Sequence, residues 1–476
     1  SRHPLRRAGL GDAQAALMNP ASQRVCVLGL GASGRAAVEW LLVQGAQVTA
    51  MDAVDNPSLR EWANAVGQGV ELRLGDCSLI EEHFDLCVIS PGIAVTHPQV
   101  TAFRAKGIPI WSELELGWQA VDCPVIGITG TNGKTTTTEM IAAVLNANDC
   151  PTITAGNIGT PLTAMAGQSK KMQWVTLEVS SFQLETIETF CPRIAVLLNL
   201  APDHLDRHGA MDGYIRAKAR LFENQTRSDF ALIQWDAWQE LQRLEVKLKS
   251  KCITFSATAS EADWYLDNSQ LVRRSPDSME SLPGFSEGGF NNQPNAENLL
   301  AALLVGHCMG LPMKDVLPPL ATYQPGAHRC ELVGEIGGVR FYNDSKATNV
   351  HALCSALRTV APDAERKNIW LIAGGKDKGL DFSAARPELE QRVKGVLLIG
   401  ESAPKIHSVW HGFAPCQIAD NLIQAVTEAG RDAVPGDVVL LSPACASFDM
   451  FDSYQHRGEA FRDALAEWQC ANGPGD

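Results

Sequence analysis

Two glycine-rich stretches of the chain have the residue types and spacing of phosphate-binding loops. Residues 29–34 are GLGASG, and residues 127–138 are GITGTNGKTTTT. Glycines let backbone amides approach a phosphate closely, and the helix that follows such a loop directs its N-terminus at the anion. Two such loops in one chain suggest that one holds the diphosphate of a large substrate and that the other holds ATP, whose γ-phosphate drives chemistry on that substrate.

The second loop predicts the ATP site. Its backbone amides would surround the phosphates, Lys134 would contact the β- and γ-phosphates, and the Thr135 hydroxyl could bind Mg²⁺. Ile128 stands where the usual P-loop pattern has its first glycine, so we expect a variant P-loop. Glu178 ends the apolar segment WVTLE, and its carboxylate could share a hard cation with Thr135. The alternative for Glu178 is a strand-end carboxylate that caps backbone amides or faces water.

The first loop predicts a diphosphate or dinucleotide site. It follows an apolar segment, and Asp52 ends the next apolar segment, where a ribose-binding acid would lie. The alternative is a glycine turn needed only for helix–sheet packing. A nicotinamide dehydrogenase would explain this loop but leaves everything after residue 125 unexplained. A P-loop switch or transport module would explain GKT but not the first glycine loop.

Three α/β blocks must position these loops. Short apolar runs bounded by Gly or Pro recur along the chain, as is typical of strands buried in a parallel sheet. We predict an α/β protein of three domains. These are a Rossmann-like N-terminal domain at residues 1–112, a central P-loop ATPase domain with a parallel sheet at residues 113–325, and a C-terminal Rossmann-like α/β domain at residues 326–476.

Composition narrows the class of partner. The chain has 476 residues and a net charge of −14, which does not suit a general nucleic-acid binder. Its 13 Cys are scattered without a CxxC pair, which fits a reducing cytoplasm. No apolar run approaches the roughly 18 residues of a membrane span. We expect a cytoplasmic monomer that acts on small molecules, with a flexible extension at residues 1–17 and an irregular segment at about residues 263–292.

Several motifs occur together in a fixed order, namely GTNGKTT, EVSSFQLE, APDHLDRHG, YIRAKARLF, NAENLLAA, HR, NDSKATN, GGKDKGLDF and SPACASFDMF. This set resembles the Mur ligases, the ATP-dependent amide ligases of peptidoglycan precursor synthesis. The resemblance runs from about residue 24 to residue 465 and implies domains for a UDP substrate, ATP and an amino acid. The last three motifs favour the branch that adds D-glutamate to UDP-N-acetylmuramoyl-L-alanine through an acyl phosphate. The alternatives are branches that add L-alanine, a diamino acid or a dipeptide, or glutamates to folate.

The resemblance implies that Lys134 and two Mg²⁺ ions neutralise charge on the transferred phosphoryl group. The metal ligands that it implies are Thr135, Glu178, His204 and Lys218. Asp203 or Asp206 could serve in place of His204. Lys218 would first be carbamylated by CO₂, which makes a carboxylate-like ligand and needs an unprotonated amine. The alternative for Lys218 is a solvated basic helix face.

The resemblance also implies contacts to each substrate. Those to ATP are Thr131, Asn132, Gly133, Lys134, Thr135, Thr136, Thr137, Asn295, Asn298, Arg329, Asp344 and Lys346. Those to the UDP substrate are Gly31, Ala32, Ser33, Asp52, Ser90, Gly92, Asn157, Ser180 and Gln183. Those to the amino acid are Thr348, Lys378, Ser447 and Phe448, with Lys376 an alternative to Lys378. Asn295 could equally be a helix N-cap, and Arg329 would need domain closure to reach ATP.

Overall fold

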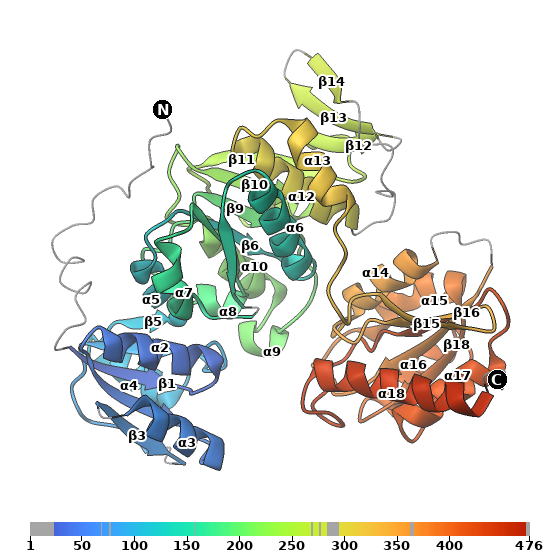
Figure 1. The fold of residues 1–476 in the computed structure, drawn as a ribbon, viewed down its shortest axis with the longest axis horizontal. Helices are drawn as coiled ribbons and strands as arrows, with labels where there is room; N and C mark the ends of the chain where they lie inside the picture. The colour runs from blue at the N-terminus through green and yellow to red at the C-terminus, as the bar shows by residue number, and fades with distance from the viewer. Residues whose placement is uncertain are drawn as a thin grey trace.

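The computed structural model describes residues 23–67, 69–75, 78–157, 159–267, 270–275, 278–282, 295–361 and 366–472. Over these residues the chain forms three sheets in succession, each flanked by helices (Figure 1). The predicted α/β architecture of three domains is therefore confirmed. The extension predicted at residues 1–17 lies outside the described residues, and the domain boundaries chosen from the sequence stay predictions.

The N-terminal sheet is parallel, with strand order β3-β2-β1-β4-β5. Its elements are β1 (Arg24–Leu28), α2 (Ala32–Val43), β2 (Gln47–Asp52), α3 (Pro57–Val66), β3 (Val70–Leu74), β4 (Leu86–Ile89), α4 (Pro98–Ala105) and β5 (Ile110–Ser112). The glycine loop joins β1 to α2. A Cβ atom on Gly34 would lie 1.8 Å from the carbonyl oxygen of Gly29. Gly34 therefore lets α2 pack directly on the loop.

The central sheet has the order β14-β13-β12-β11-β10-β9-β6-β8-β7. Its strands are β6 (Val125–Thr129), β7 (Thr152–Gly156), β8 (Trp174–Glu178), β9 (Ile194–Leu197), β10 (Phe230–Gln234), β11 (Lys251–Ser256), β12 (Trp264–Asp267), β13 (Gln270–Ser275) and β14 (Ser278–Leu282). Its helices are α5 (Glu113–Ala120), α6 (Lys134–Ala147), α7 (Leu162–Ser169), α8 (Ser181–Leu184), α9 (Leu205–His208), α10 (Met211–Ala219), α11 (Trp235–Arg243), α12 (Asn295–Cys308) and α13 (Met313–Ala321). The strands are parallel except for the antiparallel pairs β12–β13 and β13–β14.

The prediction of an irregular segment at about residues 263–292 was wrong over residues 264–267, 270–275 and 278–282. The strands β12 to β14 form there, and Trp264 and Leu271 are buried in the same core as α6 and α12. Tyr265 and Val272 are buried as well, whereas Arg273 and Arg274 are exposed, so a few apolar residues attach this polar segment to the core. Tertiary contacts, rather than local propensity, stabilise strands of this kind.

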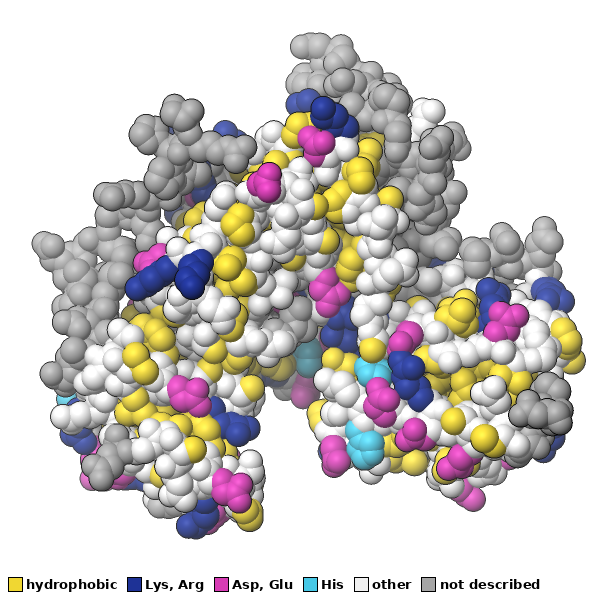
Figure 2. Space-filling model, viewed as in Figure 1, with side chains coloured by type: hydrophobic (Ala, Val, Ile, Leu, Met, Phe, Trp, Pro, Cys, Tyr) yellow, Lys and Arg dark blue, Asp and Glu magenta, His cyan; other side chains and the backbone are white. Residues whose placement is uncertain are grey.

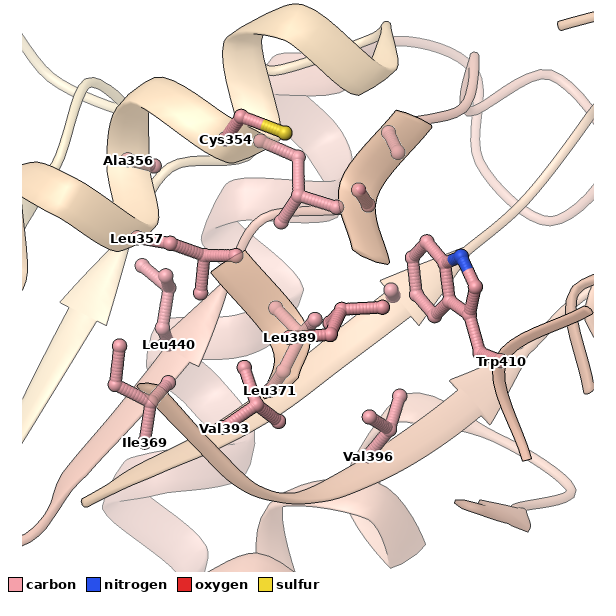
Figure 3. Packing of buried hydrophobic residues seen from close by; sticks show 14 of the residues in the cluster. Cys354, Ala356, Leu357, Ile369, Leu371, Leu389, Val393, Val396, Trp410 and Leu440 are labelled. Atoms are coloured by element: carbon pink, nitrogen blue, oxygen red, sulfur yellow. The ribbon is translucent and has the colours of Figure 1, made fainter. Parts of the chain in front are cut away.

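The C-terminal sheet has the order β15-β16-β20-β17-β18-β19 and is parallel except for the β15–β16 pair. Its elements are β15 (Glu331–Ile336), β16 (Val339–Asn343), α14 (Val350–Val360), β17 (Ile369–Gly374), α15 (Arg386–Arg392), β18 (Val393–Ile399), α16 (Ala403–Trp410), β19 (Cys416–Ile418), α17 (Leu422–Asp432), β20 (Val438–Leu441) and α18 (Tyr454–Asn472). Leu357 of α14 and Trp410 of α16 cover one face of β17 and β18 (Figure 3).

The segments with predicted functional residues follow the carboxyl ends of parallel strands. The P-loop follows β6, Glu178 ends β8, Asp344 follows β16, and Ser442 follows β20. Open α/β sheets bind their ligands at this edge. Figure 2 shows the molecule hollowed between its N-terminal and C-terminal lobes, with basic and histidine side chains where the hollow meets the central domain.

Candidate active site

The P-loop joins β6 to α6 through a backbone that only glycine adopts easily. Gly133 caps α6 with φ of 81°, and a Cβ atom there would lie 2.2 Å from the Asn298 side-chain oxygen. Lys134 turns back on the loop, and its Nζ donates to the carbonyls of Gly130 at 3.0 Å and Thr131 at 2.8 Å. The loop thus holds its lysine against its own backbone and places Asn298 beside it.

We expect Gly133→Ala to weaken ADP binding about tenfold or more, because the left-handed backbone costs an L-residue about 1–2 kcal/mol and the new methyl group must displace Asn298. Calorimetric titration with ADP measures the effect. Gly310→Ala is the matched control, since Gly310 has φ of 75° but open space where its Cβ would lie. Equal ADP affinities in the two variants would contradict the packing argument.

Glu178 is beside the P-loop because β8 pairs with β6 in a register that places it opposite Ile128. Its side chain is buried, with 2% of the residue exposed. One carboxylate oxygen accepts from the Thr135 hydroxyl at 2.6 Å, and the other accepts from the Asn157 side-chain amide at 2.8 Å. The Thr135 and Glu178 oxygens are the kind of hard ligands that Mg²⁺ prefers. Asn157, predicted to contact the UDP substrate, orients this carboxylate.

His204 precedes the short helix α9 and has a left-handed backbone, with φ of 53°. Its Nε2 lies 3.7 Å from a carboxylate oxygen of Asp203. Burial lowers the pKa of His204 to about 4, although the charge of Asp203 opposes this shift. A neutral imidazole is the form that binds metals. Of the alternatives to His204, Asp203 is buried beside it, whereas Asp206 is exposed.

Lys218 lies on α10 with its amine directed at the P-loop. Its Nζ donates to the carbonyl of Gly130 at 2.8 Å and to the Thr129 hydroxyl at 3.4 Å, and only 2% of the residue is exposed. The alternative of a solvated basic face is therefore wrong for this residue. Burial and the nearby charge of Lys134 lower the pKa of Lys218 well below its ordinary value. A neutral amine is the form that reacts with CO₂.

Two cations of the C-terminal domain contact the first turn of α6. Arg329 donates from Nη1 to the Thr136 hydroxyl at 3.0 Å, and Lys346 donates from Nζ to the Thr135 hydroxyl at 3.2 Å. Burial, together with the charge of Arg329, lowers the pKa of Lys346 to about 8. With Lys134, these cations form a positively charged site. Such a concentration of positive charge suits a polyanion such as a nucleoside triphosphate.

The tip of the P-loop also contacts the start of α14, which the sequence did not indicate. Asn349 donates to the Asn132 side-chain oxygen at 3.2 Å and to the Asp203 carboxylate at 3.2 Å. His351 Nδ1 lies 2.8 Å from the Asn132 amide nitrogen. Asn349 is the N-cap of α14, so its place before VHALCSAL was a signal for a cap but not for a contact between domains.

The amino-acid contacts predicted in the C-terminal domain lie in different environments. Lys378 is half-buried, with its Nζ 3.7 Å from the Asp203 carboxylate, whereas Lys376 is exposed. Of the two lysines, Lys378 is thus the one placed at the contact with the central domain. Ser447 is buried, and Phe448 is 70% exposed. Thr348 is half-buried just before the N-cap of α14.

Asp344, predicted to bind ribose, has both carboxylate oxygens bonded within the protein. They accept from the Cys330 backbone amide at 3.1 Å and from the Ser442 hydroxyl at 2.9 Å. Burial raises the pKa of Asp344 to about 7. The side chain therefore joins the segment that holds Arg329 to the end of β20.

In the N-terminal domain, two predicted uridine contacts shape the glycine loop. Asp52 accepts from the backbone amides of Leu30 at 2.6 Å and Val54 at 2.8 Å. Ser90 donates to the Gly29 carbonyl at 2.9 Å. Of the other candidates in this domain, Gly31 is the N-cap of α2, Ala32 and Ser33 begin that helix, and Gly92 lies in the exposed turn after β4.

Ser180 and Gln183, two further predicted contacts to the UDP substrate, are hydrogen-bonded to each other. They form a capping box at the start of α8, in which each side chain accepts from the other's backbone amide. Thr131 is bonded to the Ala201 carbonyl, and Thr137 is buried. Asn295 begins α12, but its side chain lies outside the described residues.

The described part of the chain has no group of three or more His, Cys, Asp or Glu side chains arranged to hold a metal ion. A cation at Thr135 and Glu178 would therefore complete its coordination with phosphate or water oxygens, as Mg²⁺ does in kinase and ATPase sites. Over the same described residues, no helix has the length and apolar character needed to cross a membrane.

Three family models match the chain in the order of its three sheets. The Mur ligase MurD-like N-terminal domain matches residues 23–112, the Mur ligase middle domain matches residues 128–306, and the Mur ligase glutamate ligase domain matches residues 328–445.

Whole-length relatives agree with these matches. A UDP-N-acetylmuramoylalanine--D-glutamate ligase from Koribacter versatilis is 40% identical over 453 residues, covering 94% of this chain and 98% of the relative. A protein of the same name from Acidobacterium capsulatum is 39% identical over 461 residues, covering 94% and 99%. The solved MurF ligase of Thermotoga maritima in complex with ADP has a TM-score of 0.59 at 16% identity, covering 95% of this chain and 96% of that chain. This last likeness shows the shared fold.

Proposed function

The chain belongs to the Mur ligase family, and from this premise we propose that it joins D-glutamate to UDP-N-acetylmuramoyl-L-alanine at the expense of ATP, in peptidoglycan precursor synthesis. The names of the relatives that match the whole chain support this substrate pair. The observation that supports the chemistry best is that Arg329 and Lys346 of the C-terminal domain contact the first turn of α6. A nucleotide on the P-loop would therefore lie between the central and C-terminal domains.

The reaction has two steps on the substrate. The terminal alanine carboxylate attacks the γ-phosphate of ATP, which forms an acyl phosphate and ADP. The amine of D-glutamate then attacks the acyl carbonyl and expels phosphate. Lys134, Arg329 and Lys346 stabilise the charge on the phosphate oxygens. Lys378, which lies beside Asp203, and Thr348 would hold one carboxylate of the amino acid, and Ser447 with the backbone near Phe448 would hold the other.

We assign Mg²⁺ to Thr135 and Glu178, with His204 and a carbamylated Lys218 as the candidate ligands of a second ion. The short contact between Thr135 and Glu178 and the neutral state of His204 fit this role. Mg²⁺ would supply a fixed positive charge near the transferred phosphoryl group. Every cysteine that the structure describes is a free thiol, which supports a cytoplasmic location.

Release of phosphate tests the proposed function. With UDP-N-acetylmuramoyl-L-alanine, ATP and Mg²⁺, we expect phosphate release to depend on added amino acid. Release with L-glutamate should be at least about a hundredfold slower than with D-glutamate, because the enantiomer cannot place both carboxylates and the amine at once. Equal rates with L-glutamate, or a preference for L-alanine, a diamino acid or a dipeptide, would assign the protein to another branch of the family.

A further inference from the structure

Arg207 connects the central domain to the turn of the N-terminal domain that carries the predicted uridine contacts Ser90 and Gly92. It lies on α9, three residues after His204. Its Nη1 donates to the carbonyl of Pro91 at 2.6 Å, and its Nη2 donates to the carbonyl of Ile93 at 2.9 Å. Both carbonyls belong to the turn after β4, on either side of Gly92. No assigned role in the reaction uses this arginine.

The guanidinium is held in place from the central domain. Nε and Nη2 both donate to the Glu185 carboxylate, with Nη2 at 2.6 Å, and the group lies 4.1 Å from the centre of the Phe182 ring. The side chain is only 12% exposed, as is that of Glu185. A paired and stacked guanidinium loses little entropy on binding, so the two carbonyl contacts are well ordered.

These contacts form a continuous path between the two predicted substrate sites. On one side, Ser90 of the same turn donates to Gly29 of the first glycine loop. On the other side, the Phe182 ring that packs on Arg207 also packs on His204, with ring centres 4.7 Å apart. A change in the position of Arg207 would therefore alter how the diphosphate loop lies relative to the site of phosphoryl transfer.

We propose that Arg207 is a positioning residue that sets the distance between the uridine-binding turn and the phosphoryl-transfer site, so that the substrate carboxylate reaches the γ-phosphate. This inference rests on the proposed function. The N-terminal domain does not depend on Arg207 for its attachment, because α2 also packs against α5 and α7. Loss of the guanidinium should therefore disturb alignment rather than folding. Misalignment of about 1 Å costs about a hundredfold in rate.

The test is Arg207→Lys, since an ammonium cannot span the two carbonyls and the Glu185 carboxylate at once. We expect kcat to fall about a hundredfold, while the affinity for UDP alone changes less than about threefold and thermal stability changes little. UDP reports the N-terminal domain by itself, and kcat reports its alignment with the central domain. A merely structural role would lower UDP affinity and stability together with the rate.

The matched control is Arg193→Lys. Like Arg207, Arg193 donates to a carboxylate, that of Asp229, but its second partner, the Ser228 hydroxyl, belongs to the same central domain. It should keep the wild-type kcat. If Arg207→Lys does not fold, Glu185→Gln replaces it, since the amide weakens the hold on the guanidinium, and a smaller loss of kcat is then expected. Wild-type kcat in a folded variant at either position would overturn the inference. A wild-type protein without ligase activity would instead overturn the proposed function.

Discussion

Lys134→Ala should lower kcat by about a thousandfold or more and leave the affinity for the UDP substrate unchanged. In the structure Nζ is bonded to two carbonyls of its own loop, and it can exchange these for phosphate oxygens when a nucleotide binds. Burial lowers the pKa of Lys134, and the positive charges of Arg329 and Lys378 lower it further. The negative charges of Glu178 and Asp203 oppose this shift. The negative charge of bound phosphates would offset the repulsion among these cations. Lys134 should therefore stabilise the transition state most, where negative charge builds on the phosphate oxygens.

Phosphate release measures the rate of this variant, and calorimetry with UDP-N-acetylmuramoyl-L-alanine measures its binding. Lys249→Ala, at an exposed position of the same domain, is the control and should keep both properties. If Lys134→Ala retains its rate, the P-loop does not hold the reacting phosphates. If it loses substrate binding as well, the two nucleotide sites are not independent.

The sequence predicted which segments meet, because parallel strands have one functional edge. The strand before GTNGKT and the strand that ends at Glu178 were both recognisable as apolar runs. Parallel strands of one sheet have their carboxyl ends at the same edge, where open α/β sheets bind ligands. Glu178 accordingly contacts Thr135 at 2.6 Å. Burial of Lys218, by contrast, depends on how α10 packs under the P-loop, and nothing in YIRAKARLF distinguishes that arrangement from a solvated helix face.

The sequence could not predict which polar groups are already engaged by the protein. Asp52, Ser90 and Asp344 have the residue types that bind a nucleotide, but each is hydrogen-bonded to backbone or side-chain groups of its own domain. A carboxylate or hydroxyl has the same chemistry in both situations. The tertiary fold decides which partner it meets, since Ser90 and Gly29 are 61 positions apart and Ser442 and Asp344 are 98 apart.

Contacts between domains could not be predicted from the sequence either. Asn132 and Asn349 exchange hydrogen bonds across 217 positions of sequence. Each also has a sufficient local explanation, one as a loop residue and the other as an N-cap. Arg329 was expected to need domain closure, and in this structure it already contacts Thr136. The placement of the C-terminal domain against α6 is therefore what turns separate motifs into one candidate site.

Lys218→Arg should lose at least about a hundredfold in kcat, as should Lys218→Ala, if the lysine acts as a carbamate. A buried ammonium is costly without a charged partner, and the hydrogen-bond acceptors of this amine are the Gly130 carbonyl and the Thr129 hydroxyl. The neutral amine that burial favours is also the nucleophile for CO₂. The resulting carboxylate would extend from α10 toward the P-loop, where it could bind a cation.

Arginine separates the two possible roles of Lys218, because a guanidinium keeps the positive charge but does not form a carbamate. A variant Lys218→Arg that retains the wild-type rate would show that the residue acts as a cation. The carbamate itself should appear as a ¹³C resonance when the wild-type protein is equilibrated with labelled bicarbonate, and it should be absent from both variants. Arg216→Ala, on the same helix but on its exposed side, should retain the resonance and the rate, since the proposed chemistry depends on burial of the amine against Gly130.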